Sequence, residues 1–168
     1  MRRLLVAVSL LVVVAPASAA TSLKPVRSGK FSMRVPTAWK ARTNVGTLAL
    51  IAASTRPEGG FFTNANVIAG APRAGAPITE WRSDLVAQLR RAGLVIGKPR
   101  SRVVRLPAGR AVEIAFGGSL SGHKLRWLTY AYDAGAKAYI LTFTTAASQY
   151  ARNAPLFRRL SRTVRIRR

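Results

Sequence analysis

The feature that most constrains the fold is a series of four short strand-like segments between residues 102 and 144. Apolar and polar residues alternate over 110–116, as they do in a strand with one buried face. Turn-forming residues break the series at 107–109, 117–122 and 133–135. Connections this short predict an antiparallel meander. Its four strands are expected at 102–106, 110–116, 124–132 and 138–144.

The remaining chain supplies further strands and two helical regions. Strand patterns lie at 31–35, 47–53 and 61–69, and a last short edge strand is expected near 164–166. An apolar stripe at helical spacing predicts a helix near 79–92. A second helical region is expected over 148–162, where Asn153 and Pro155 suit a helix start. Since the strands carry apolar residues on both faces, the sequence predicts an α+β fold, an α/β/α sandwich. Its central antiparallel sheet has six or seven strands, covered by these helices.

The first 19 residues match a secretory signal peptide. Arg2 and Arg3 precede an apolar segment at 4–14, and Ala17 and Ala19 form the small pair at the cleavage region. A membrane anchor is the alternative, but the segment is much shorter than the roughly 20 apolar residues that a spanning helix needs. We therefore predict a cleaved leader, a flexible lead-in over 20–30 and a single domain over 31–168.

The net charge points to anionic partners. The formal charge is +23, with 28 basic and five acidic residues, and loss of Arg2 and Arg3 would leave +21. Such a charge favours phospholipid head groups or anionic envelope polymers, and export makes nucleic acid the least favoured polyanion. A compositional bias toward arginine is an equally good explanation, since only six of the basic residues are lysine. The chain has no cysteine, which excludes disulfides, thiolate catalysis and a lipid-modified cysteine.

Residues suited to catalysis are few. His123 is the only histidine and lies near Ser119 and Ser121, a spacing that seldom builds a nucleophile–base pair. Glu80 and Asp84 are four residues apart in the first predicted helix, where surface ion pairs with Arg82 or Arg91 explain them better than acid–base work. The sequence has no metal-binding or cofactor-binding motif, so we expect no cofactor.

Two groups of residues suit a surface for anionic ligands. Along the strand at 124–132, alternation places Lys124, Arg126, Tyr130 and Tyr132 on one face, with Trp127 on the other. This face could bind an anionic polymer by charge and stacking, but aromatic residues in the middle of a meander are more often core, which favours tyrosines packed beneath a helix. The second group lies near the C-terminus and consists of Arg158, Arg159 and Arg162.

Several short motifs resemble PsbP-like domains. Phe31-x-Met33-x-Val35-Pro36-x-x-Trp39 is similar to their opening strand, and residues 64–67 (NANV) are similar to their third strand. The C-terminal half shares their pattern through Tyr130, Tyr132, the segment 138–143 (AYILTF), Tyr150 and Phe157. The family includes the photosystem II subunit PsbP, a Ran-binding protein and many secreted bacterial proteins. The resemblance implies an α/β/α sandwich and an accessory or binding role.

These observations lead to three functional hypotheses. The first is an exported, non-enzymatic accessory or binding protein that acts at an anionic cell-envelope surface. The alternative is a secreted hydrolase of unknown substrate that uses His123 or the Glu80–Asp84 pair. The third is a protein-interaction subunit of an envelope complex.

Overall fold

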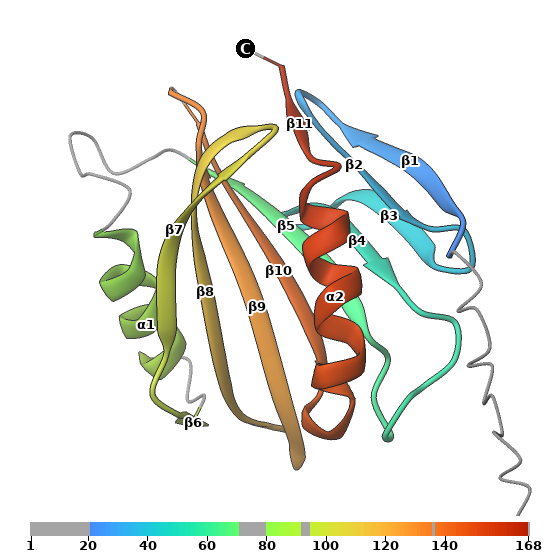
Figure 1. Ribbon diagram of the computed structural model, residues 1–168, viewed down its shortest axis with the longest axis vertical. Coiled ribbons are helices and arrows are strands. Elements are labelled where there is room, and N and C mark those ends of the chain that lie inside the picture. The colour runs from blue at the N-terminus through green and yellow to red at the C-terminus, as the bar shows by residue number, and fades with distance from the viewer. Residues whose placement is uncertain (1–20, 71–79, 92–94, 136, 168) are drawn as a thin grey trace, which may run out of the picture.

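The computed structural model describes residues 21–70, 80–91, 95–135 and 137–167. In these residues the chain forms two antiparallel sheets and two α-helices (Figure 1). The predicted signal peptide, with Ala17 and Ala19, lies outside the described residues. No helix among the described residues is long and apolar enough to cross a membrane.

The larger sheet has eight strands. Its order is β3-β4-β5-β10-β9-β8-β6, and β7 also pairs with β8. The bounds of the first half are β3 Lys40–Val45, β4 Leu48–Ala53 and β5 Asn64–Gly70. The second half comprises β6 Val95–Ile96, β7 Arg100–Leu106, β8 Gly109–Leu120, β9 His123–Asp133 and β10 Ala138–Ala146. The pairing of β7, β8, β9 and β10 confirms the predicted meander.

The large sheet is seven strands wide, as predicted, because β6 and β7 lie one after the other along the same edge of β8. Both β6 and β7 pair with β8, β6 near residues 118–119 and β7 over residues 109–115. Between them, the Gly97 amide donates to the Gly117 carbonyl at 2.7 Å and continues the ladder. The sheet is therefore seven strands wide, although eight strands build it.

A second sheet of three strands was not predicted. Its order is β1-β2-β11, with β1 Leu23–Ser28, β2 Phe31–Pro36 and β11 Arg165–Ile166. The expected flexible lead-in is wrong over β1, because residues 23–28 pair with β2 along its whole length. The strand was missed because Pro25 argues against a strand, yet an edge position tolerates proline. The sheet joins the two ends of the domain.

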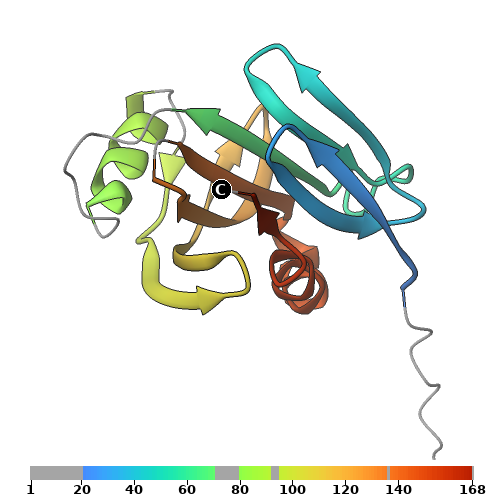
Figure 2. The same ribbon diagram turned by 90° about the horizontal axis from the view of Figure 1, so that it is seen from above.

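The helices lie on opposite faces of the large sheet (Figure 2). Helix α1, Trp81–Arg91, packs near β6 and β8, and its Leu85 packs against a cluster of buried side chains on one face that includes Val112 and Ile114. Helix α2, Tyr150–Ser161, follows a short 3₁₀ turn, η1 Ala147–Gln149, and covers the other face. This arrangement confirms the α+β sandwich.

The main core lies between α2, the small sheet and the large sheet. Phe157 and Leu160 of α2 are fully buried there, beside Phe31 and Met33 of β2. The Phe143 ring stacks on Phe157 with their centroids 4.8 Å apart. Because β2 contributes to this core, the small sheet has one buried face and one face toward solvent.

Local differences from the prediction have clear causes. The turn expected at 117–122 is shorter, because β8 continues to Leu120 and only Ser121 and Gly122 form the turn. Both have positive φ, +49° and +80°, which matches the twist of a two-residue hairpin. Helix α2 also runs unbroken through Pro155. Asn153 does not start a helix there: it is buried and donates to Thr145 Oγ1 at 3.0 Å.

Candidate anion-binding site

The outer face of the small sheet carries a cleft with four arginines, which we call the arginine cleft. Its volume is about 680 Å³, and Ser32 and Thr163 lie in its lining. Strand alternation explains the cleft, since Met33 faces the core while its neighbours face outward. The arginines come from β1, β2, the end of α2 and β11: Arg27, Arg34, Arg162 and Arg165.

The strand register brings two of these arginines beside one serine. Ser32 of β2 pairs with Arg27 on one side and with Arg165 on the other. Neighbouring strands lie about 4.8 Å apart, so the two arginine backbones are about 10 Å apart with a small side chain between them. This spacing leaves room for an anion between two guanidinium groups. Ser32 offers a hydroxyl to the same position.

Backbone carbonyls hold two of the arginines in place. Arg165 donates from Nη1 to the carbonyls of Arg162 and Val164, at 3.2 and 2.9 Å, and Arg34 donates from Nη2 to the Leu23 carbonyl at 3.0 Å. Within the described residues, the Arg27 and Arg162 guanidinium groups have no hydrogen bond or ion pair. The cleft thus combines two positioned cations with two unpaired ones.

The cleft is electrostatically unbalanced. In the described part of the chain, no aspartate or glutamate lines it. Arg162 is the C-cap residue of α2, where the negative end of the helix dipole favours a cation by about 0.3–1 kcal/mol. Because the helix dipole acts only over the last turn, it offsets only a small part of the positive charge of the four arginines. An anionic ligand that accepts hydrogen bonds from several guanidinium groups would complete the cleft.

Lys124 and Arg126, which the sequence placed with the tyrosines, belong to a different cleft. We call it the hairpin cleft: it has a volume of about 430 Å³, with Lys98 as its third cation. Arg126 pairs with Gly117 in the ladder, and a Cβ at Gly117 would lie 2.9 Å from Arg126 Cδ. The missing side chain lets Arg126 reach the ring of Tyr150, with Cζ 4.9 Å from its centroid.

Tyr130 and Tyr132 do not belong to a ligand surface; of the two alternatives for these tyrosines, the structure supports packing beneath a helix. They do share the face of Lys124 and Arg126, but both are buried within the α2-covered core. The Tyr130 hydroxyl donates to Glu113 Oε2 at 2.7 Å, and Tyr132 donates to the Ser161 carbonyl at 3.4 Å. Burial raises the pKa of each tyrosine far above its ordinary value, so both hydroxyls stay protonated at neutral pH.

The predicted C-terminal arginines lie along α2. Arg158, Arg159 and Arg162 are all exposed. Only Arg162 lines the arginine cleft, whereas Arg159 donates to the Thr21 carbonyl at 3.3 Å. The structure therefore separates the predicted ligand surface into a helix surface and two clefts.

The residues considered for catalysis remain apart. His123 is exposed at the β8–β9 turn, and its ring lies 6.1 Å from that of Phe61. Among the described residues, His123 has no hydrogen bond to a serine or a carboxylate. Glu80 precedes α1 and Asp84 lies in its first turn. The described residues contain no group of three histidine, cysteine or acidic side chains that could hold a metal ion.

Sequence reasoning missed three of the four cleft arginines. Arg27 lies in the lead-in predicted over 20–30, and Arg34 lies at a polar position of the strand predicted at 31–35. Arg165 had a clearer signal, because it alternates with the apolar Val164 and Ile166. What the sequence could not show is the register that aligns Arg27 and Arg165 across Ser32.

Three solved structures similar to this chain come from three different organisms. PsbP (CyanoP) from Synechocystis sp. PCC 6803 aligns with a TM-score of 0.67 and 10% identity, over 91% of this chain and 97% of that protein. The Ran-binding protein Mog1p of Saccharomyces cerevisiae aligns with a TM-score of 0.63 and 10% identity, over 88% and 96%. LpqN, involved in cell envelope biogenesis of Mycobacterium tuberculosis, aligns with a TM-score of 0.59 and 10% identity, over 88% and 91%.

These likenesses confirm the PsbP-like fold that the sequence motifs suggested. No family model matches the chain, and no curated protein matches it in sequence. At 10% identity, the structural agreement concerns the fold and not the chemistry. Function must therefore be argued from this chain's own residues.

Proposed function

We propose that this chain is an exported accessory protein that binds phosphate-bearing groups of the cell envelope through the arginine cleft, without catalysing a reaction. The single observation that carries the proposal is the rung in which Arg27 and Arg165 flank Ser32, in a cleft with no acid among the described residues. Arginine suits this role because its planar guanidinium group donates paired hydrogen bonds to phosphate oxygens.

The proposed location rests on the leader. Its charged start, apolar segment and small residues at 17 and 19 fit export and cleavage. Among the proteins that share the fold, LpqN is described as involved in cell envelope biogenesis, which agrees with an envelope role. A protein partner in the envelope remains a second proposal, since Mog1p is described as Ran-binding. Mass spectrometry of the exported protein should show that residues 1–19 are absent.

Calorimetric titration with tripolyphosphate tests binding at the arginine cleft. We expect binding at about 10 mM salt that weakens strongly near 150 mM, because the Debye length shortens from about 30 to 8 Å. The double variant Arg27→Gln/Arg162→Gln should bind at least about 10-fold more weakly, since hydrogen bonds to charged groups contribute about 1.5–3 kcal/mol each. Among the residues that the structure describes, neither guanidinium group has a partner that its loss would leave unpaired.

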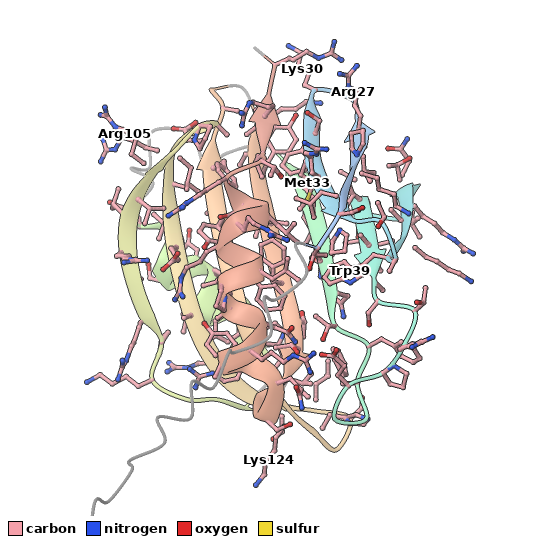
Figure 3. The ribbon with its side chains drawn as sticks, turned by 45° about the vertical axis from the view of Figure 1, so that its right-hand side comes forward. Arg27, Lys30, Met33, Trp39, Arg105 and Lys124 are labelled. Atoms are coloured by element: carbon pink, nitrogen blue, oxygen red, sulfur yellow. The ribbon has the colours of Figure 1, made fainter. Side chains whose placement is uncertain are left out.

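A matched control separates the cleft from overall charge. Arg105→Gln/Arg110→Gln removes two exposed arginines at the β7–β8 hairpin, where they pair with each other in the ladder. Figure 3 shows Arg105 on the opposite side of the molecule from Arg27. This variant should retain tripolyphosphate affinity within about 3-fold, because distant exposed charges are screened. Equal losses in both variants would contradict a localised site.

A further inference from the structure

The two basic clefts lie at opposite ends of α2, and exposed arginines of the helix lie between them. We propose that this surface forms a continuous track that binds a linear polyanion with repeating phosphate groups, long enough to occupy both clefts at once. The inference rests on the proposed function, because the arginine cleft is one end of the track. It goes further by naming a polymer, and not a single phosphate group, as the ligand.

The placement of the clefts follows from the residues that line them. Ala147, just before α2, lines the hairpin cleft together with Lys124. Arg162, just after α2, lines the arginine cleft together with Arg27. Figure 3 shows Lys124 and Arg27 at opposite ends of the helix. A ligand that contacts both clefts must extend along α2.

The surface between the clefts is also cationic. Four exposed arginines lie on or next to the helix: Arg152, Arg158, Arg159 and Arg162. The carboxylate beside Arg152 and Arg159 is that of Glu58, whose Oε2 accepts a hydrogen bond from Asn153 at 3.3 Å. The other acid near α2, Glu113, is buried and bonded to Tyr130 and Arg102. A phosphate chain that follows α2 therefore meets four arginines and, beside Arg152 and Arg159, the half-buried carboxylate of Glu58.

The geometry favours a flexible chain over a flat membrane. Helix α2 has 12 residues and a length of about 18 Å at 1.5 Å per residue. The two clefts are small and lie at the two ends of one narrow helix, so a polymer strand can follow α2 and contact both, whereas a bilayer would contact the whole face around them. Simultaneous occupancy turns the second contact into an intramolecular one, which raises affinity by about 10²–10⁴-fold when the geometry permits.

The test compares a short and a long probe on variants of the hairpin cleft. Tripolyphosphate is too short to occupy both clefts, and long-chain polyphosphate can span them. The variant Lys98→Gln/Lys124→Gln should weaken long-chain binding by at least about 10-fold and tripolyphosphate binding by less than about 3-fold. Arg126 is left intact because its contact with Tyr150 helps to hold the α2 end of the cleft. Arg105→Gln/Arg110→Gln again removes two charges elsewhere.

The outcomes separate the two proposals. Suppose that tripolyphosphate binds, but that the hairpin-cleft variant and the control variant weaken long-chain binding equally. This result would overturn the track and leave the arginine-cleft proposal in place. Failure of tripolyphosphate to bind the unmodified protein at about 10 mM salt would overturn both. Anionic vesicles of phosphatidylglycerol provide the remaining comparison. If the hairpin-cleft variant loses vesicle binding as strongly as long-chain binding, the surface is a membrane contact and the polymer proposal is wrong.

Discussion

Arg102 of the large sheet and the cleft arginines of the small sheet have opposite surroundings. In the large sheet, Arg102 of β7 donates from Nε to Glu113 Oε1 at 2.8 Å, and Tyr130 donates to the other oxygen. In the small sheet, four arginines share a cleft that no acid lines among the described residues. A paired arginine next to a buried acid is explained by stability. Unpaired arginines gathered in a cleft are not, so the comparison points to the small sheet as the place of function.

The buried polar groups beneath α2 also have hydrogen-bond partners, in contrast to the unpaired arginines of the arginine cleft. Asn153 donates to Thr145, and Thr145 and Thr63 hydroxyls lie 2.9 Å apart, all of them buried. These groups satisfy one another and attach α2 to the large sheet. In the arginine cleft, the guanidinium N–H donors of Arg27 and Arg162 have no acceptor among the described residues. They are therefore available to a ligand. Mutations should therefore divide into those that change stability and those that change binding.

The largest effect should come from the acid beneath α2. Glu113→Ala leaves the buried Tyr130 hydroxyl without its acceptor, and we expect the free energy of unfolding to fall by about 2–3 kcal/mol. Urea unfolding followed by circular dichroism measures it. Arg102→Gln is the control, and its cost should stay below about 1 kcal/mol because 62% of the Arg102 side chain is exposed. A larger loss of unfolding free energy for Arg102→Gln than for Glu113→Ala would contradict the assignment of Glu113 as the more important member of the pair.

A somewhat smaller loss is expected at the buried amide of α2. Asn153→Ala removes the donor to Thr145 and should lower the free energy of unfolding by about 1–2 kcal/mol. The neighbouring exposed Arg152→Ala should change it by less than about 0.5 kcal/mol. Urea midpoints of the two variants, measured side by side, give the answer. Equal midpoints would show that the network does not anchor the helix.

Alkaline pH should weaken the core through its tyrosines. Burial raises the pKa of Tyr132 above its unfolded value of about 10, so its contribution is complete below pH 10 and decreases as pH rises further. The loss is about 1.4 kcal/mol per pH unit for one such group. Tyr132→Phe should therefore reduce the drop in unfolding free energy between pH 9 and pH 11. An unchanged drop would show that Tyr132 does not contribute to it.

The smallest effect on stability should come from the arginine cleft. Arg27→Gln/Arg162→Gln removes two unpaired cations, and the free energy of unfolding should change by less than about 0.5 kcal/mol or rise slightly as repulsion decreases. Thermal melts without ligand measure this change. A loss above about 1 kcal/mol would mean that these arginines stabilise the fold and would remove the contrast between the two sheets.

The strands with alternating or wholly apolar sequences could be predicted, and two polar edge strands, β1 and β3, could not. Alternation located β2 and β8, and the apolar run located β4. The sequence of β3, Lys40–Val45, is largely polar because it lies at an open edge, and β1 contains a proline for the same reason. Edge strands have few buried side chains, so the periodicity that identifies a strand is weak there.

The candidate site shows the same limit. Alternation correctly placed Lys124, Arg126, Tyr130 and Tyr132 on one face of β9, but it does not say which part of that face a helix covers. Phe157 and its neighbours on α2 cover the tyrosines, whereas Lys124 and Arg126 stay exposed near the start of the helix, with Arg126 against the Tyr150 ring. Only Arg162 among the predicted C-terminal arginines reached the arginine cleft.

The sequence by itself determined the meander, the positions of the helices, the charge and the shortage of catalytic residues. Local periodicity, turn chemistry and composition are sufficient for these, because each depends on residues close together in the chain. Only the tertiary structure decided that residues 23–28 form a strand, that Arg27 and Arg165 flank Ser32, and that basic clefts lie at both ends of α2. The rung of Arg27, Ser32 and Arg165 depends on register between β2 and β11, strands more than 130 residues apart, which no local pattern encodes. Residues 23–28 pair with the neighbouring strand β2, but Pro25 weakens the strand signal there. The clefts combine residues from several elements, which local periodicity does not bring together.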